Sequence, residues 1–228
     1  MNNLMKYIII AVLVFGLGGV LYFSGSQSDD ADGNQVEAID WDKTYDQYSK
    51  HPYGTFFMRK ILEVGLDGHE VSNIDVAVQD YFKYDSLKLE GANITYMFIG
   101  KSLNLYDHEV DSLLQFASLG NQLFIAAENL PVNLLKTLFE NYDAHDYFSF
   151  TEDTSVALTY ENSTFNTEFV LKNQIKDNLK RQRWRNINYG IDYNHSGEVL
   201  GKAGSRPCYL KFKIGAGTVL LHTIPQAF

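Results

Sequence analysis

The chain has 228 residues, and its charges are unevenly placed along its length. Residues 24–228 hold 18 of the 19 basic residues and all 28 acidic residues, so this part carries a net charge of −10. Such a surface repels phosphate backbones, which argues against nucleic acid as a general partner. The single cysteine, Cys208, excludes an internal disulfide and a cysteine-based zinc cluster.

The first element in chain order is an uncharged apolar segment, residues 7–23. Its length approaches the roughly 20 residues that a bilayer core requires. Because Lys6 precedes it and three aspartates follow soon after it, we expect a retained transmembrane anchor, with residues 1–6 in the cytoplasm and the rest exported. A cleaved signal peptide is the alternative, because residues 24–26 are small enough for a cleavage site.

A flexible stalk and a folded domain follow the anchor. Residues 24–38 are polar and acidic, which predicts the stalk, and a single domain is expected over residues 39–228. Its first helix is expected over residues 56–64, with Thr55 as a candidate N-cap and a glycine at the C-terminal end. Four apolar residues of this helix are expected to face inward: Phe57, Ile61, Leu62 and Val64.

The clearest pattern runs from residue 93 to residue 128 and predicts a βαβ unit with parallel strands. Residues 94–99 and 123–127 are short apolar runs typical of buried strands. Residues 106–119 show helical periodicity and end before Gly120, and a loop is expected over residues 100–105. Pro131 is expected to open another helix.

The remainder of the chain is rich in β patterns. Strands are expected over residues 156–160, 165–171, 208–214 and 218–222, and residues 215–217 are expected to form a hairpin turn. The sequence therefore predicts an α/β fold, a Rossmann-like sheet with flanking helices and a β-rich C-terminal part.

A family resemblance enters at these motifs. Trp41, the stretch 51–55, the βαβ unit and the C-terminal strands up to residue 228 resemble a bacterial domain-of-unknown-function family. The resemblance implies a membrane-anchored domain with a class I glutamine-amidotransferase-like fold in the bacterial inner membrane, usually encoded beside MoxR-type AAA ATPases. Members of that family continue past the position of Phe228 into a second membrane span, so it also implies either a shortened chain or a fragment.

A true class I amidotransferase needs a nucleophilic cysteine on a tight strand-to-helix turn, with a histidine as base. Neither expected strand end supplies it, because Ser102 follows the first strand and Glu128 follows the second. Cys208 lies within an expected strand, which favours a small buried side chain. Ser102 with His222 as base is the alternative, although the flanks of Ser102 lack the G-x-S-x-G pattern.

One basic cluster interrupts the acidic domain, and we expect it on one helix face. It is a candidate contact for anionic headgroups or an acidic partner, with an aromatic anchor, although a solvated face is the simpler interpretation. The candidate binding residues are Lys172, Lys176, Lys180, Arg181, Arg183 and Trp184, with Arg185 beside them.

The six histidines are scattered and form no metal-binding spacing, so neither a metal nor a cofactor is expected. The leading hypothesis is a non-enzymatic, membrane-anchored interaction module of an envelope assembly. The alternative is a ligand-binding or hydrolytic domain that uses a strand-end crevice near Ser102, Glu128 and His222.

Overall fold

The computed structural model describes residues 43–51, 53–65, 70–76, 78–85, 93–139, 148–153, 155–160, 169–172, 182–187 and 197–228. These residues fall into two compact units. The smaller lies within Asp46–Asn73, and the larger comprises Lys43–Tyr45 and Ile74–Phe228. The expected span over residues 7–23 and the expected stalk lie outside the described residues. No described helix is long and apolar enough to cross a membrane.

The smaller unit contains helix α2 (Phe56–Gly65), which confirms the helix expected over residues 56–64. The backbone N–H of Arg59 donates to the carbonyl of Thr55 at 2.9 Å, so the helix begins where the candidate cap predicted. The inward stripe is wrong at three of its four positions, because Phe57, Ile61 and Val64 are 63%, 40% and 80% exposed, whereas Leu62 is partly buried. The reason is that the opposite face of α2, which carries Arg59, makes the polar contacts within this unit.

The larger unit is built on the expected βαβ arrangement of β1 (Thr95–Ser102), α4 (Asp107–Ser118) and β2 (Gln122–Asn129). The two strands pair in parallel, as predicted. Strand β1 continues to Ser102, three residues into the loop expected from residue 100, because Ser102 still pairs with Asn129. Helix α4 ends before Gly120, whose φ of +102° is one that residues with a Cβ rarely adopt.

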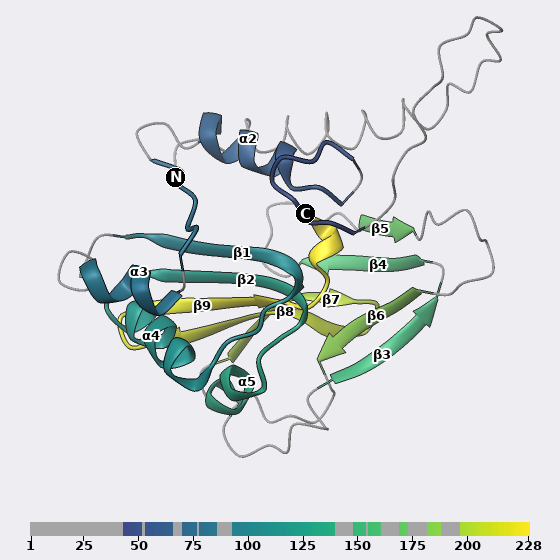
Figure 1. The fold of residues 1–228 in the computed structure, drawn as a ribbon. Helices are drawn as coiled ribbons and strands as arrows, with labels where there is room; N and C mark the ends of the chain where they lie inside the picture. The colour runs from purple at the N-terminus through teal and green to yellow at the C-terminus, as the bar shows by residue number, and fades with distance from the viewer. Residues whose placement is uncertain are drawn as a thin grey trace, which may run out of the picture. The chain divides into compact units, whose positions relative to one another are not determined.

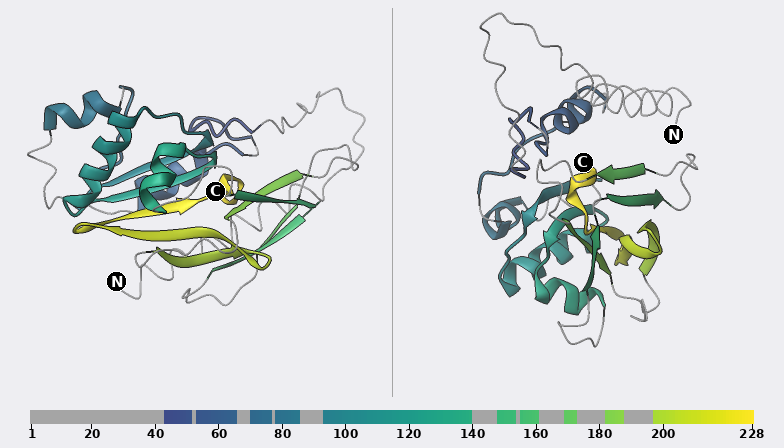
Figure 2. Two further views of the ribbon diagram at one scale, coloured as in Figure 1. Left: turned by 90° about the horizontal axis from the view of Figure 1, so that it is seen from below. Right: turned by 90° about the vertical axis from the view of Figure 1, so that its right-hand side faces the viewer.

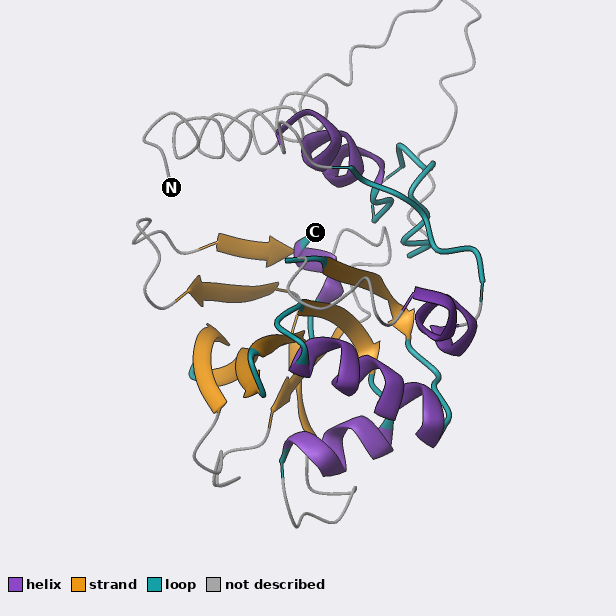
Figure 3. Cartoon of the chain, turned by 90° about the vertical axis from the view of Figure 1, so that its left-hand side faces the viewer, coloured by secondary structure: helices purple, strands orange, loops and turns teal. Residues whose placement is uncertain are grey.

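Helix α4 packs on the sheet with two further helices of the larger unit. Helix α5 (Val132–Leu138) follows Pro131 as expected. Helix α3 (Val78–Asp85) was not predicted, and its Phe82 ring lies 4.8 Å from the ring of Phe116 in α4. Figures 1 and 3 show α4 and α5 along the same face of the sheet. The main core therefore lies between these helices and the sheet.

The sheet has seven strands in the order β1-β2-β9-β8-β7-β4-β5. Strands β1, β2 and β9 are parallel, and the rest of the order is joined by antiparallel pairing. Figures 1 and 2 show how the sheet curls toward β4 and β5. The remaining bounds are β4 (Ser155–Tyr160), β5 (Phe169–Lys172), β7 (Gly197–Ala203), β8 (Arg206–Ile214), β9 (Gly217–His222) and the 3₁₀ turn η2 (Pro225–Ala227).

The hairpin expected at residues 215–217 joins β8 to β9 and is confirmed. Gly215 has a φ of +58°, and a Cβ there would lie 2.8 Å from the carbonyl oxygen of Ser118. Glycine is therefore required at this turn both by the backbone angle and by the close approach of the end of α4.

A separate ribbon pairs β3 (Phe148–Asp153) with β6 (Gln182–Ile187) in antiparallel fashion. The helix expected around the basic cluster is wrong at both ends, because Lys172 belongs to β5 and Arg183 and Trp184 belong to β6. Trp184 is 2% exposed and packs with Val156, Leu158 and Cys208. Burial of this indole against residues of β4 and β8 favoured strand pairing over the helical spacing of the lysines.

Candidate functional site

The carboxyl ends of the parallel strands are the region where open α/β sheets bind ligands. In this chain, Ser102 ends β1, Glu128 lies next to the end of β2, and His222 ends β9. The register places Ser102 beside Asn129 and His222 beside Ala126, so the topology brings all three predicted residues to one edge of the sheet. Their side chains, however, make different contacts there.

Ser102 is bound by its neighbour in the sheet. The amide Nδ2 of Asn129 donates to the Oγ of Ser102 at 2.8 Å, and the carbonyl of Asn129 accepts the backbone N–H of Leu103 at 3.0 Å. Within the described part of the chain, neither a histidine nor a carboxylate hydrogen-bonds to this hydroxyl. Because nothing there removes its proton, Ser102 has the setting of a strand-end structural serine.

Glu128 is the centre of a polar cluster, and its Oε1 accepts three hydrogen bonds. The donors are the ammonium of Lys43 at 3.0 Å, the hydroxyl of Tyr45 at 3.1 Å and the amide of Gln226 at 2.5 Å. The carboxylate side chain is only 24% exposed. Glu128 thus joins the segment Lys43–Tyr45 and the turn η2 to the end of β2.

His222 is completely buried, and its ring lies among aromatic side chains. The rings of Phe228, Tyr209 and Tyr160 have centroids 5.1, 5.2 and 6.3 Å from the imidazole. Burial lowers the pKa of His222 to about 3, so the ring is neutral at physiological pH.

The tautomer of His222 follows from its hydrogen bonds. Nδ1 accepts the backbone N–H of Ile224 at 3.1 Å, so the proton of the neutral ring is on Nε2. Nε2 is buried and has no hydrogen-bond partner among the described residues. A base must present an unprotonated nitrogen to its substrate, and the only such nitrogen of His222 is engaged by the backbone.

A shallow groove lies beside these residues rather than between them. It has a volume of about 620 Å³ and is formed by the segments that follow β1 and β2. Part of its wall is held by the Nδ2 of Asn133, which donates to the Oδ1 of Asp107 at 2.8 Å. None of the three predicted side chains lines it; the groove is bordered by Leu103, Asn104, Leu105, Asp107, Asn129, Leu130, Pro131, Val132, Asn133 and Lys136.

Cys208 lies in β8, as predicted, and is completely buried. Burial raises the pKa of its thiol to about 12, so the nucleophilic thiolate is scarce at neutral pH. Nowhere in the described ranges do three His, Cys, Asp or Glu side chains gather as metal ligands would.

The basic cluster loses its proposed aromatic anchor, because the indole of Trp184 is buried. It lies in a second core cluster, formed by Val156, Leu158, Trp184, Ala203, Cys208 and Ile224. Lys176, Lys180 and Arg181 lie outside the described residues. Contact of the remaining basic residues with headgroups or a partner stays a prediction.

Sequence reasoning missed the partners that engage the predicted residues. Lys43, Tyr45 and Gln226 are 83 to 98 residues away from Glu128 along the chain. The available signal was a carboxylate at the end of an apolar strand, which required a partner once buried. The identity of that partner depended on the packing of both ends of the described chain against β2.

No family model matches the chain, and no curated protein matches it. Solved structures similar to it include an exo-β-1,4-mannosidase, Op5Man5, from Opitutaceae bacterium strain TAV5, at 16% identity and a TM-score of 0.37, over 58% of this chain and 21% of that one. A protein described as ThuA-like, from Bacteroides uniformis, is similar at 14% identity and a TM-score of 0.47. The match covers 75% of this chain and 73% of that one. Cytoplasmic protein STM3548 from Salmonella typhimurium is similar at 8% identity and a TM-score of 0.43. The match covers 75% of this chain and 76% of that one. These likenesses identify neither a family nor an activity.

Proposed function

We propose that this chain is a non-catalytic interaction module anchored in the bacterial inner membrane by residues 7–23, with its folded part outside the cytoplasm. The observation that carries the non-catalytic assignment is that Ser102, Glu128 and His222 share a sheet edge but are engaged separately. Each has a structural partner, and the only histidine of the three is buried and neutral.

The anchoring part of the proposal is supported by sequence. Residues 7–23 carry no charge, Lys6 precedes them, and Asp29, Asp30 and Asp32 follow them. A chain of full mass should be found in the membrane fraction, and external protease should cut residues 24–36 only when the outer face is accessible. A mature form that begins between residues 24 and 28 would contradict anchoring.

The non-catalytic part is tested by substitution at the two candidate nucleophiles. Ser102→Ala and Cys208→Ala should each complement a deletion strain as well as the unchanged chain does. Loss of complementation by a variant that is folded and present at normal abundance would contradict the proposal.

The family resemblance supports partners in a membrane assembly linked to a MoxR-type ATPase. Crosslinking of the full chain in intact membranes, followed by identification of the captured proteins, tests this part. Recovery of membrane proteins encoded beside such an ATPase is the expected result. Recovery of the chain alone, at crosslinker levels that capture known complexes, would contradict it.

A second candidate function is favoured by the groove of about 620 Å³, which lies in the size range of small-molecule sites. Its polar side chains include Asn104, Asn129 and Lys136, which suit a polar ligand. Thermal shift measurements with sugars, amino acids and nucleotides would test it. A stabilising compound should lose its effect in Asn133→Leu and keep it in Val170→Ser, which changes an exposed residue of β5.

A further inference from the structure

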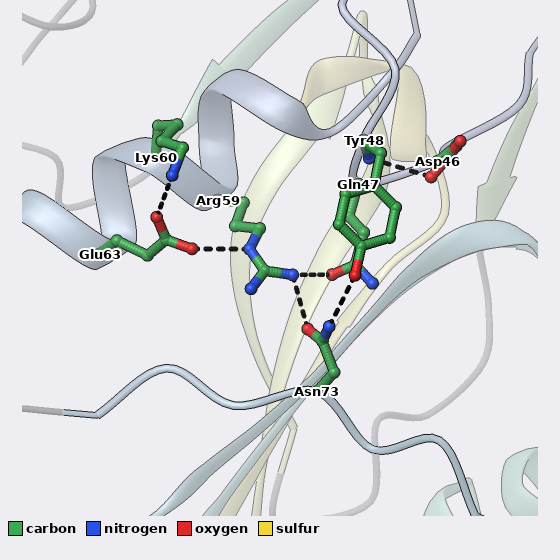
Figure 4. A network of polar contacts seen from close by, with 7 residues as sticks. All are labelled: Asp46, Gln47, Tyr48, Arg59, Lys60, Glu63 and Asn73. Atoms are coloured by element: carbon green, nitrogen blue, oxygen red, sulfur yellow. Dashed lines mark hydrogen bonds and ion pairs between the residues drawn. The ribbon is translucent and has the colours of Figure 1, made fainter.

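Helix α2 has an unusual orientation, because its polar side makes the contacts within its own unit. Arg59 donates to Glu63 at 2.7 Å, to the side-chain oxygen of Gln47 at 2.5 Å and to that of Asn73 at 2.7 Å. Figure 4 shows these bonds converging on the guanidinium. The Nδ2 of Asn73 in turn donates to the hydroxyl of Tyr48 at 3.1 Å.

The apolar side of α2 is left exposed. Phe57, Ile61 and Val64 follow the spacing i, i+4 and i+7, which places them on one face, whereas Arg59 and Glu63 lie on the other. We call these three residues the apolar stripe. They are 63%, 40% and 80% exposed, and no residue of α2 is fully buried.

The segment around the apolar stripe has a slight net positive charge, +1 over residues 46–65, unlike the chain as a whole. Lys60 precedes Ile61 in the helix; its side chain is 54% exposed and its ammonium pairs with Glu63 at 2.5 Å, while the ammonium of Lys50 lies 5.1 Å from the ring centre of Phe56. Residues 46–65 contain three basic and two acidic residues, within a chain whose net charge is −9. A short apolar face flanked by lysines is the pattern of helices that lie in the bilayer interface.

We infer that the apolar stripe of α2 docks into the headgroup region of the membrane in which the chain is anchored. This inference rests on the proposed anchoring by residues 7–23. Only 19 residues, 24–42, separate that segment from Lys43, so the described part begins no more than about 65 Å of extended chain from the bilayer.

The size of the apolar stripe favours lipid over protein. Stable protein interfaces bury about 800 Å² on each partner, which three side chains on a ten-residue helix do not supply. A tethered helix needs far less, because the anchor holds it at a high effective concentration near the bilayer. A second copy of the chain or a protein partner is therefore the less favoured occupant.

The test uses the full chain in phosphatidylcholine vesicles that contain phosphatidylglycerol. A cysteine at Phe57→Cys or Val64→Cys carries an environment-sensitive fluorophore. Native Cys208 is buried with a raised pKa and should remain unlabelled. The control is Val170→Cys in β5, another exposed apolar position. An alkaline wash reports separately whether the chain is anchored.

In washed vesicles, the fluorescence emission of probes at 57 and 64 should shift to shorter wavelength. Brominated lipids should quench this emission, and bromines near the headgroups should quench it more than bromines at the tail ends. The probe at 170 should be unaffected. Placing Phe57→Ser and Ile61→Ser in the Val64→Cys chain should abolish quenching at 64.

An anchored chain whose probes at 57 and 64 are not quenched would overturn the inference and leave the proposed anchoring intact. Release of the chain by the alkaline wash would overturn both. Shielding of the probe at 57 that rises with the protein-to-lipid ratio, without quenching by brominated lipid, would assign the apolar stripe to a second copy and overturn the inference as well.

Discussion

Helices α4 and α2 were predicted from the same kind of apolar spacing, yet they bury opposite faces. In α4, Val110, Leu113 and Ala117 are at most 2% exposed and pack between helix and sheet. In α2, the corresponding apolar positions are 40% to 80% exposed, and Arg59 makes the contacts. Periodicity therefore predicts that a helix forms and which residues share a face, but the available partners decide which face is covered.

The largest expected effect follows directly from this contrast. Leu113→Ala removes a fully buried side chain from α4 and should lower the free energy of unfolding by about 2–5 kcal/mol. Ile61→Ala is the matched change in α2 and should alter stability by no more than about 0.5 kcal/mol. Urea unfolding of the two variants measures the difference. Equal destabilisation would mean that the apolar stripe is covered within the chain.

The second prediction concerns the acid stability of the larger unit. Because the folded pKa of His222 is about 3 and its usual value is 6.5, the unfolded chain takes up a proton between these pH values that the folded chain does not. The contribution of His222 to the free energy of unfolding is fully present above pH 6.5. It falls by about 1.4 kcal/mol for each pH unit below that value, until about pH 3.

The matched variant is His222→Gln, whose side-chain oxygen keeps an acceptor for the N–H of Ile224. Its unfolding free energy should depend less steeply on pH between 6 and 4 than that of the unchanged chain, whatever its absolute stability. Parallel pH dependences would show that His222 is protonated in the folded chain.

A smaller effect is expected at Cys208, which packs with Trp184 in the second core cluster. Cys208→Ala removes one buried sulfur and should cost about 1–2 kcal/mol of unfolding free energy. The thiol of the unchanged chain should react with a thiol reagent only at the rate of unfolding, because it is buried and its pKa is raised. Fast modification under native conditions would refute this placement.

The smallest effect is expected at the pair of Glu128 and Lys43, whose side chains are 24% and 22% exposed. A double-mutant cycle of Glu128→Gln and Lys43→Met should give a coupling energy of about 0.5–1 kcal/mol, reduced by salt. A coupling indistinguishable from zero at low salt would show that the segment Lys43–Tyr45 is held to β2 by its other contacts.

The course of the chain through the βαβ unit was readable because its signals are local. Helix α4 begins near the acidic first turn of Asp107 and ends before Gly120, and buried strands are short apolar runs. The helix predicted for the basic segment was wrong because lysine spacing alone says nothing about Trp184, whose burial depends on strands β4 and β8. Helix α3 gave no pattern strong enough to predict.

For the candidate site, too, the sequence predicted the positions of the residues but not their contacts. The sequence placed Ser102, Glu128 and His222 at the ends of strands, and the parallel order of β1, β2 and β9 brought those ends to one edge. Their chemistry depended on contacts with distant residues. Asn129 binds the serine, Lys43 and Gln226 bind the carboxylate, and aromatic rings enclose the imidazole.

The sequence by itself determined the helices and strands of the βαβ unit, the hairpin at Gly215 and the buried position of Cys208, because backbone preference and apolar spacing act over a few residues. Only the tertiary structure decided that β9 joins β2, that Trp184 lies in a strand and that α2 turns its polar face toward its own unit. These choices depend on which surfaces far apart in the chain cover one another, and the free energy of covering apolar area outweighs the small local preferences.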